Sequence, residues 1–221
     1  MLKYTKNFLF DQNAKKIKKT HWHQTENSVR LLNEKYEKAV FGEVSPWDLV
    51  EKLADCVDPS DRELYGISQL IHTFQALESM EKHNVKNEEY IVGAILHDVG
   101  KTLLLTGENP ANVVCDNGII TGEKKSGWDN CITHWNHDEF AYMRFKNYVP
   151  HEIAWLIRYH SMNLKQSESF ADARDKELIQ KFLLPFKKHD KLTKSICHVP
   201  KIDIEKYKRL LEKHLPKKIM I

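Results

Sequence analysis

Residues 91–101 of the chain read Ile91-Val92-Gly93-Ala94-Ile95-Leu96-His97-Asp98-Val99-Gly100-Lys101, an apolar run that ends in an adjacent histidine and aspartate. Neighbouring positions lie about 100° apart around a helix, so near a helix end both side chains can face one pocket. The imidazole could then bind one metal ion while the carboxylate bridges to a second. We interpret Gly100 as the helix stop, because glycine accepts the left-handed conformation that is common there.

The rest of the composition is that of a soluble globular protein. The chain has 221 residues, of which 41% are hydrophobic and 29% are charged, so it can bury a core. We find no internal repeat or low-complexity linker and therefore expect one domain over residues 1–221. Within it, residues 1–44 should form an N-terminal arm and a helix on the core, and residues 201–221 a C-terminal helix.

Charge and cysteine usage favour a protein without nucleic-acid or membrane partners. The net charge is only +3, and the lysines concentrated in residues 1–20 suit a solvated helix face better than a nucleic-acid arm. The four cysteines form no CxxC pair, which is typical of free thiols in a reducing compartment. Met1–Phe10 lacks the apolar core of a signal peptide, and no apolar run is long enough to cross a membrane. We expect a cytoplasmic monomer.

The hydrophobic pattern predicts an all-α protein. Only 8 Gly and 7 Pro occur, and few runs alternate between apolar and polar residues. Ser45 and Asn87 are expected N-caps, and Pro185 an expected helix stop. An irregular stretch is expected over 106–130. The helical segments are expected at 13–41, 46–53, 64–80, 88–98, 131–148, 150–160, 175–184 and 203–215.

Several of these helices carry a histidine or aspartate that could bind metal. A set of imidazoles and carboxylates without cysteine suits iron, manganese or zinc. If Asp98 bridges, one metal ion receives four ligands and the other three, which leaves positions open for a substrate. The chain has 12 histidines, so spacing alone leaves core histidines as the alternative. The candidate ligands are His72, His97, Asp98, His137, His160 and Asp190.

The order His…His-Asp…His…His…Asp resembles the HD-domain superfamily, and the residues around it are similar to the myo-inositol oxygenase family. This likeness runs from residue 6 to the C-terminal tail, with two further blocks at His21–Thr25 and Leu53–Pro59. The main blocks are His72-Thr73-Phe74-Gln75, Leu96-His97-Asp98-Val99-Gly100-Lys101, Trp135-Asn136-His137-Asp138-Glu139-Phe140, Ile157-Arg158-Tyr159-His160-Ser161 and His189-Asp190-Lys191-Leu192-Thr193-Lys194.

The resemblance implies an HD-domain-like helical bundle around a mixed-valent Fe(II)/Fe(III) pair. The first iron would be held by His72, His97, Asp98 and Asp190, and the second by Asp98, His137 and His160. The implied reaction uses O2 to cleave the ring of myo-inositol, a small polyol, to D-glucuronate without an external reductant. Asp98 and Lys101 would be the catalytic residues. The positions that match substrate contacts of the family are Asp55, Lys101, Asp116, Ser161 and Lys194.

The chain departs from the family near the substrate. The segment between Asp116 and His137 is shorter than in the animal enzyme, Cys115 replaces a glycine, and the N-terminal substrate-binding arginine has no counterpart unless Lys6 takes its place. Two other enzymatic functions therefore stay open. One is a di-iron oxygenase acting on a hydroxyalkyl phosphonate, with Lys124 and Lys125 as added cations. The other is an HD phosphohydrolase that uses a metal-activated water. A non-catalytic binding module would leave the ligand set without a purpose.

Overall fold

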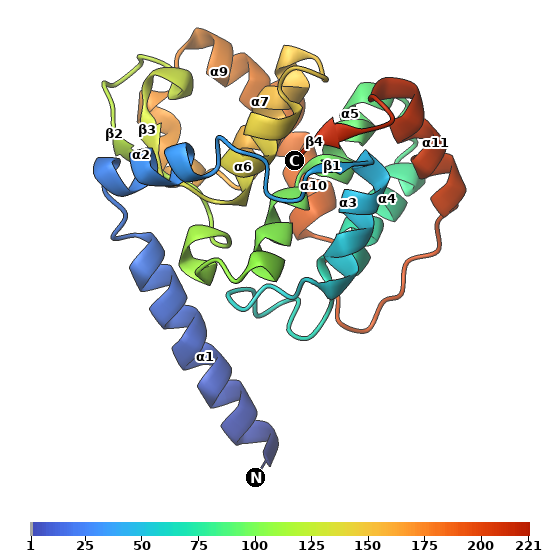
Figure 1. Ribbon diagram of the computed structural model, residues 1–221, viewed down its shortest axis with the longest axis horizontal. Helices are drawn as coiled ribbons and strands as arrows, with labels where there is room; N and C mark the ends of the chain where they lie inside the picture. Colours follow the sequence, from blue (N-terminus) through green and yellow to red (C-terminus); the bar gives the residue numbers. More distant parts are fainter. Residues whose placement is uncertain (1) are drawn as a thin grey trace.

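The computed structural model describes residues 2–221, and for residues 2–9 it describes the backbone alone. The Lys6 side chain therefore lies outside the described residues. The chain is all-α, as the hydrophobic pattern predicts (Figure 1). Its α-helices are α1 (Leu2–His21), α2 (Glu26–Lys35), α3 (Pro46–Glu51), α4 (Gln69–Lys82), α5 (Glu88–Leu96), α6 (His137–Phe145), α7 (His151–Tyr159), α8 (Leu164–Ser167), α9 (Ala173–Leu178), α10 (Leu184–Lys191) and α11 (Ile204–His214).

The strands are short and form two antiparallel pairs. β1 (Glu43–Val44) pairs with β4 (Ile219–Met220), which ties the C-terminus to the segment before α3. β2 (Ile119–Thr121) pairs with β3 (Ile132–Thr133) inside the expected irregular stretch. Among the described residues, no helix combines the length and the hydrophobicity needed to span a membrane.

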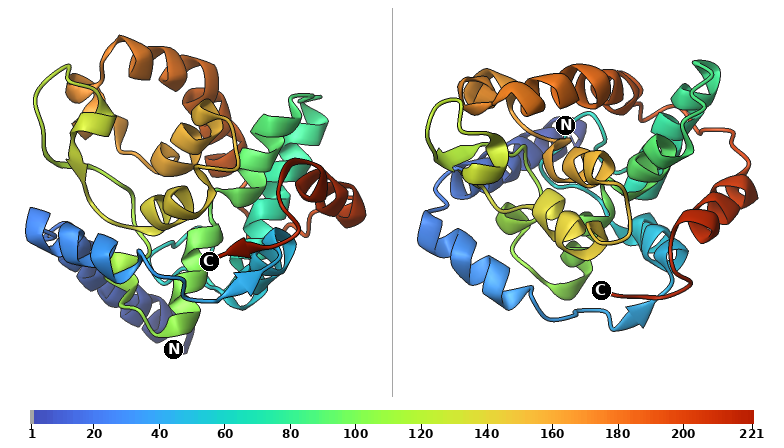
Figure 2. Two further views of the ribbon diagram at one scale, coloured as in Figure 1. Left: turned by 45° about the horizontal axis from the view of Figure 1, so that its top comes forward. Right: turned by 90° about the horizontal axis from the view of Figure 1, so that it is seen from above.

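Helix α5 lies at the centre of the bundle. Its residues Val92, Ala94, Ile95 and Leu96 are at most 1% exposed, and a helix that is apolar all round must be covered on all sides. α4, α7 and α11 pack against it, and α10 packs on α4 (Figures 1 and 2). The C-terminal end of α5, which is followed directly by His97 and Asp98, therefore lies inside the molecule.

The caps follow the sequence. Ser45 and Asn87 accept hydrogen bonds from the N–H groups of Asp48 and Tyr90, which confirms both as N-caps. The expected C-terminal helix is present as α11, and it docks on the body through the buried side chains of Tyr207 and Leu211. Several helix boundaries, by contrast, differ from the prediction.

The helix expected over 13–41 is wrong, because the chain breaks between α1 and α2. Thr25 has an extended backbone, and its side chain accepts a hydrogen bond from the N–H of Ser28 while Ser28 returns one to Thr25. This reciprocal cap starts a new helix and satisfies its first N–H groups. Because of this turn, the ring of Trp22 lies beside the ring of His134, and the two ring centroids are 4.5 Å apart.

Gly100 is not the helix stop that the sequence suggests. After α5 the chain continues as a 3₁₀-helix over Val99–Thr106, and Gly107, with φ of +79°, closes that segment. Gly100 serves a close approach instead, because a Cβ there would lie 2.1 Å from the carbonyl oxygen of His137. The glycine thus lets α6 begin directly beside the end of α5.

Pro185 does not stop a helix either. A π-helical segment (Ile179–Leu183) joins α9 to α10, and Pro185 falls in the first turn of α10. A proline is tolerated in a first turn because its missing N–H would lack a helical partner there. The chain can therefore continue to Asp190, near the end of α10.

Two further helices start later than expected. Residues 131–136 hold β3 and the cap Asn136, so α6 starts only at His137. Residues 64–66 form a turn and 67–68 are extended or irregular, so α4 starts at Gln69 after the cap Ser68.

Candidate metal centre

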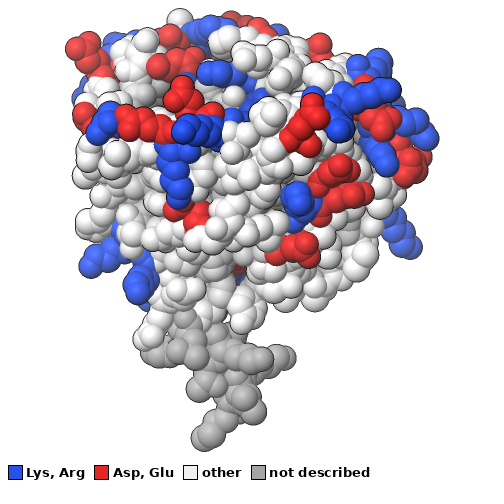
Figure 3. All heavy atoms as spheres, in the orientation of Figure 1, with Lys and Arg blue, Asp and Glu red and all other residues white. Residues whose placement is uncertain are grey.

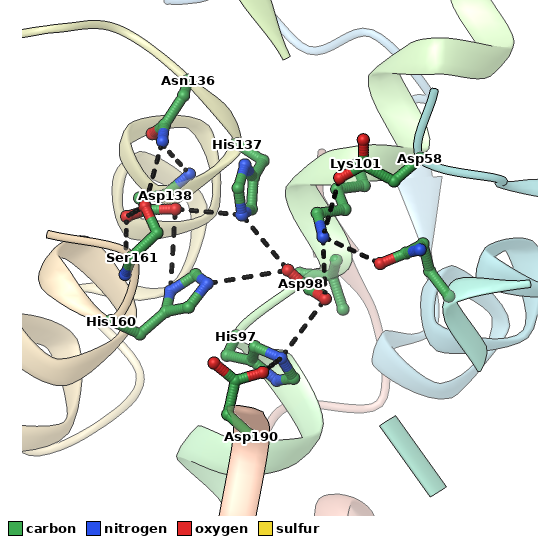
Figure 4. A network of polar contacts seen from close by, with 12 residues as sticks. Asp58, His97, Asp98, Lys101, Asn136, His137, Asp138, His160, Ser161 and Asp190 are labelled. Carbon is green, nitrogen blue, oxygen red and sulfur yellow. Dashed lines mark hydrogen bonds and ion pairs between the residues drawn. The ribbon is translucent and has the colours of Figure 1, made fainter. Parts of the chain in front are cut away.

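The six candidate ligands converge on one buried cluster, and Figure 4 labels all of them except His72. α4 contributes His72 from its first turn, and the others lie at or next to the ends of α5, α6, α7 and α10. Two groups form, each able to hold a metal ion, and they share one aspartate. The groups are His72, His97 and Asp98, and Asp98, His137 and His160; Asp190 lies beside the first.

Asp98 turns one carboxylate oxygen toward each group. Its Oδ2 lies 3.3 Å from His97 Nε2 and 3.7 Å from His72 Nε2. Its Oδ1 lies 3.1 Å from His137 Nε2 and 3.6 Å from His160 Nε2. A carboxylate placed in this way can bridge two cations.

Three histidines present a lone pair to the cluster. The Nδ1 atoms of His97, His137 and His160 lie 2.7–3.0 Å from the carbonyl oxygens of Ala94, Val113 and Ile157. A carbonyl can only accept, so Nδ1 carries the proton and Nε2 of the neutral ring is free to bind metal. The Nε2 atoms of His97 and His137 are buried without a hydrogen-bond partner. Buried ring nitrogens without a protein partner are the atoms that a metal ion would bind.

His72 and Asp190 form the outer side of the first group. His72 Nε2 lies 2.9 Å from Asp190 Oδ1, while its Nδ1 has no partner. Burial and the hydrogen bond from His72 act in opposite directions on Asp190, and the net effect is a pKa well below the usual value. Asp190 is therefore ionised at neutral pH. A donor set of imidazoles and carboxylates fits iron, and no thiolate is present among these residues.

A buried lysine compensates the charge of Asp98. Lys101 Nζ donates to Gln69 Oε1 at 2.8 Å and to Asp98 Oδ2 at 3.1 Å, and lies 3.4 Å from Asp58 Oδ2. Burial alone would lower the pKa of Lys101, but Asp98 and Asp58 raise it above the usual value. Burial likewise opposes ionisation of Asp98, yet Lys101 and His97 hold its pKa well below normal. Both groups are charged at neutral pH.

A third carboxylate lies beside the second group and was missed by sequence reasoning. Asp138 is fully buried, its Oδ1 lies 3.1 Å from His137 Nε2, and its Oδ2 accepts the Ser161 hydroxyl at 2.6 Å. Its signal in the sequence is the second His-Asp pair, which repeats the pair at His97. Asn136 caps α6 through the N–H of Asp138 and also donates to Ser161.

A cavity of about 660 Å³ opens onto the cluster. Of the predicted substrate contacts, Lys101, Asp116, Ser161 and Lys194 line it. The structure does not bring Asp55 together with them, because this residue is exposed and outside the cavity wall.

Asp58 takes the place expected for Asp55. It is 4% exposed, lines the cavity, and accepts hydrogen bonds from the backbone and hydroxyl of Ser60. In the sequence, both aspartates lie in the same short acidic segment before Pro59. Only the fold distinguishes the aspartate that faces inward from the one that faces solvent.

The cavity wall carries both signs of charge. Lys194 donates to Asp61 at 2.6 Å across the cavity mouth. Lys124 and Lys125, the cations considered for a phosphonate, are exposed and do not line the cavity. The outer surface is mixed as well, with positive and negative side chains interspersed on the face seen in Figure 3.

The fold and this cluster define a class: helical proteins that gather histidines and aspartates from several helices into a buried site able to hold metal. Comparison with known families is more specific. The family model described as myo-inositol oxygenase matches residues 11–123 and 115–221, and the chain belongs to this family. The two matched parts meet at residues 115–123, in the segment that the sequence shows to be shortened.

Curated relatives agree with this family. The chain is 25% identical to the inositol oxygenase of Danio rerio over 94% of its own length and 88% of the relative's. It is 27% identical to inositol oxygenase 1 of Arabidopsis thaliana, over 90% of this chain and 76% of that one. The inositol oxygenase of Rattus norvegicus is 28% identical over 72% of this chain and 67% of its own.

Proposed function

We propose that this chain is a di-iron oxygenase that uses O2 to cleave the ring of myo-inositol to D-glucuronate, or the ring of a closely similar cyclic polyol to the corresponding uronic acid. The observation that carries the proposal is the position of Asp98, with one oxygen facing His72 and His97 and the other facing His137 and His160. Family membership and the names of the relatives support the same activity.

Bound iron would supply the reduction of O2 and the polarisation of substrate hydroxyls. His72, His97 and Asp190 would hold one ion, His137 and His160 the other, and Asp98 both. Backbone carbonyls fix the orientation of three of the imidazoles. Phe186 of α10 packs against the rings of His97 and His160 and keeps water from that side.

Lys101 would stabilise negative charge on a substrate oxygen. Its raised pKa means that it stays protonated at neutral pH and cannot act as a base. A fixed cation in a buried site lowers the energy of a developing alkoxide more than it would in water. Lys194, paired with Asp61, supplies a second cation to the same cavity.

The cavity suits a neutral polyol better than a strongly charged substrate. Carboxylates, ammonium groups and the hydroxyls of Ser60 and Ser161 all line it, so substrate hydroxyls can find donors and acceptors. Each buried hydroxyl left unpaired would cost about 1–3 kcal/mol. The cations considered for a phosphonate lie outside the cavity, so no specific observation favours that substrate.

The test is iron-reconstituted protein supplied with O2 and myo-inositol. We expect two iron ions per chain, one for each group that can hold metal, and O2 uptake that depends on myo-inositol. His137→Ala should lose iron and O2 uptake, whereas His151→Ala, which changes an exposed histidine of α7, should keep both. Full iron binding without polyol-dependent O2 uptake would contradict the proposed reaction, and release of phosphate from a phosphate ester would favour the hydrolase.

A further inference from the structure

Cys115 has a strained backbone conformation. Its φ is +91°, a region that favours glycine because a Cβ is crowded there. The other described non-glycine residues with positive φ, Asn84 and Lys125, are exposed. Cys115 is 9% exposed and lies on the wall of the substrate cavity. Strain retained beside a functional site is a reason to ask what the side chain does there.

The start of α6 holds this strained segment in place. The side-chain amide of Asn136 donates to the carbonyl oxygen of Cys115 at 2.9 Å. Two residues earlier, the Val113 carbonyl accepts both the backbone N–H and Nδ1 of His137, at 2.9 and 2.7 Å. The backbone of 113–115 is thus fixed by the same contacts that orient a metal ligand. This backbone therefore cannot shift to relieve the crowding around the Cβ of Cys115.

The thiol itself faces the cavity beside the loop that carries Asp58. Burial raises the pKa of Cys115 to about 12, Asp58 adds to that rise, and Ser60 and Lys18 oppose it. All three of these neighbours line the cavity. The thiol is therefore neutral at physiological pH, so it is a poor nucleophile and its main effect is to occupy space.

We propose that Cys115 is a specificity-determining residue, whose Sγ fills the part of the cavity beside Asp58 and Ser60 where one more ring hydroxyl would otherwise fit. This inference rests on the proposed polyol oxygenase function. A thiol is larger than the hydrogen atom of a glycine side chain, so it takes up space that a substrate hydroxyl would need. It is also only a weak hydrogen-bond donor and acceptor, so it offers a nearby hydroxyl no good partner. The favoured substrate then presents a C–H group to this wall. A ring that lacks one hydroxyl meets this condition better than myo-inositol does.

Three substitutions separate volume from polarity and from strain. Cys115→Ala removes Sγ and keeps the Cβ. Cys115→Gly removes both and also relieves the backbone. Cys115→Ser keeps the size of the side chain and supplies a better hydrogen-bonding group. Cys56→Ala is the matched control, because Cys56 is buried in the core and does not line the cavity.

The experiment measures binding of myo-inositol and of a monodeoxy-inositol to iron-loaded protein by calorimetry, with turnover of both followed in parallel. Relative to wild type, the ratio of the two affinities should shift at least tenfold toward myo-inositol in Cys115→Ala and Cys115→Gly. It should change less in Cys115→Ser and not at all in Cys56→Ala. Thermal unfolding of each variant confirms that it is folded, and Cys115→Gly should be no less stable than Cys115→Ala.

The outcomes also separate this inference from the proposed function. A shifted ratio without turnover of either polyol would reject the oxygenase reaction and support the role of Cys115. Turnover with an unchanged ratio in Cys115→Ala and Cys115→Gly would reject the role of Cys115 and keep the oxygenase. A shift confined to Cys115→Ser would show that polarity, not volume, matters and would overturn the inference. Failure of every variant to bind either polyol would overturn both.

Discussion

Gly100 lies directly against the backbone of His137 in the metal centre. A methyl group at this position would meet the carbonyl and Cα of His137, which belong to the start of α6 and cannot rotate away. Gly100→Ala should therefore lower the free energy of unfolding by about 3 kcal/mol or more, since overpacking costs roughly 1–3 kcal/mol even where side chains can yield. Urea denaturation of the metal-free protein measures it.

The control for this change is Gly107→Ala. Gly107 has φ of +79°, and a Cβ at this position would have no neighbouring atom within 4 Å, so the substitution adds only backbone strain. We expect a loss of about 1 kcal/mol. Equal losses at the two positions would show that the contact with His137 is unimportant.

Lys101 should matter for rate more than for binding. Lys101→Met removes the cation beside Asp98 and leaves Asp58 and Gln69 without their partner. If Lys101 stabilises charge that develops only during reaction, kcat should fall by about 10²–10³ with little change in KM. Steady-state kinetics at equal iron content tests this, and a rise in KM at constant kcat would assign the lysine to ground-state binding.

At the level of single residues, the sequence is informative where chemistry restricts the choice. Imidazoles and carboxylates near helix ends could be selected from the pattern, and the structure brings the six selected residues into one cluster. Their roles as ligands stay a prediction. Asp55 and Asp58 are chemically identical and three positions apart, so nothing local distinguishes them. Gly100 shows the same limit, because its role depends on a residue 37 positions later.

Among the elements, the junction between α2 and the segment after Gly107 offers a pH-dependent contact. Glu108 accepts hydrogen bonds from Lys35, from the hydroxyl of Tyr36 and from Asn112 at 2.9 Å. Burial would raise the pKa of Glu108, but the hydrogen bonds, that of Lys35 first, lower it to about 2. A carboxylate with a depressed pKa stabilises the fold above its unfolded value, near 4.5, and this stabilisation is lost as the pH falls toward 2.

Glu108→Gln should therefore be less stable than wild type at pH 7 by about 1 kcal/mol, because solvent screens part of this contact. The difference should shrink as the pH is lowered from 4.5 toward 2. Urea denaturation of both proteins at several pH values measures it. A difference that is constant across this range would show that ionisation of Glu108 does not contribute.

Element type could be predicted more securely than element boundaries. The apolar periodicity that marks α4 and α7 depends on burial of one face, and the continuous apolar run of α5 depends on burial on all sides; the tertiary structure provides both. The break at Thr25 and the continuation through Pro185 depend on hydrogen bonds made by a few atoms. A local cap outweighed helical periodicity in the first case, and a π-helical segment accommodated the proline in the second.

For the whole molecule, metal should act as a structural element. The two groups and Asp190 beside them come from α4, α6, α10 and the ends of α5 and α7, so a bound ion would link helices that are far apart in the sequence. Free metal at about 100 times its dissociation constant stabilises a native site by about 2.7 kcal/mol. Removing iron with a chelator should therefore lower Tm by about 5–10 °C. An unchanged Tm in differential scanning calorimetry would show that the cluster does not bind metal in the folded state.

The arrangement of the helices was beyond prediction from the residues alone, because ligand convergence depends on packing between segments distant in the sequence. Resemblance to a family supplied that information, and the family match now extends it to nearly the whole chain. What the family does not supply is the substrate, since Cys115, a position that departs from it, lines the cavity.

The most direct test of the account is a single turnover experiment under ¹⁸O₂. Iron-loaded, partly reduced protein is given myo-inositol, and the products are read by mass spectrometry. We predict D-glucuronate with one labelled oxygen atom, the other leaving as water, because one O2 accepts the four electrons of the ring cleavage. Unlabelled product, or protein that binds no iron at all, would contradict the assignment of this chain as a di-iron oxygenase.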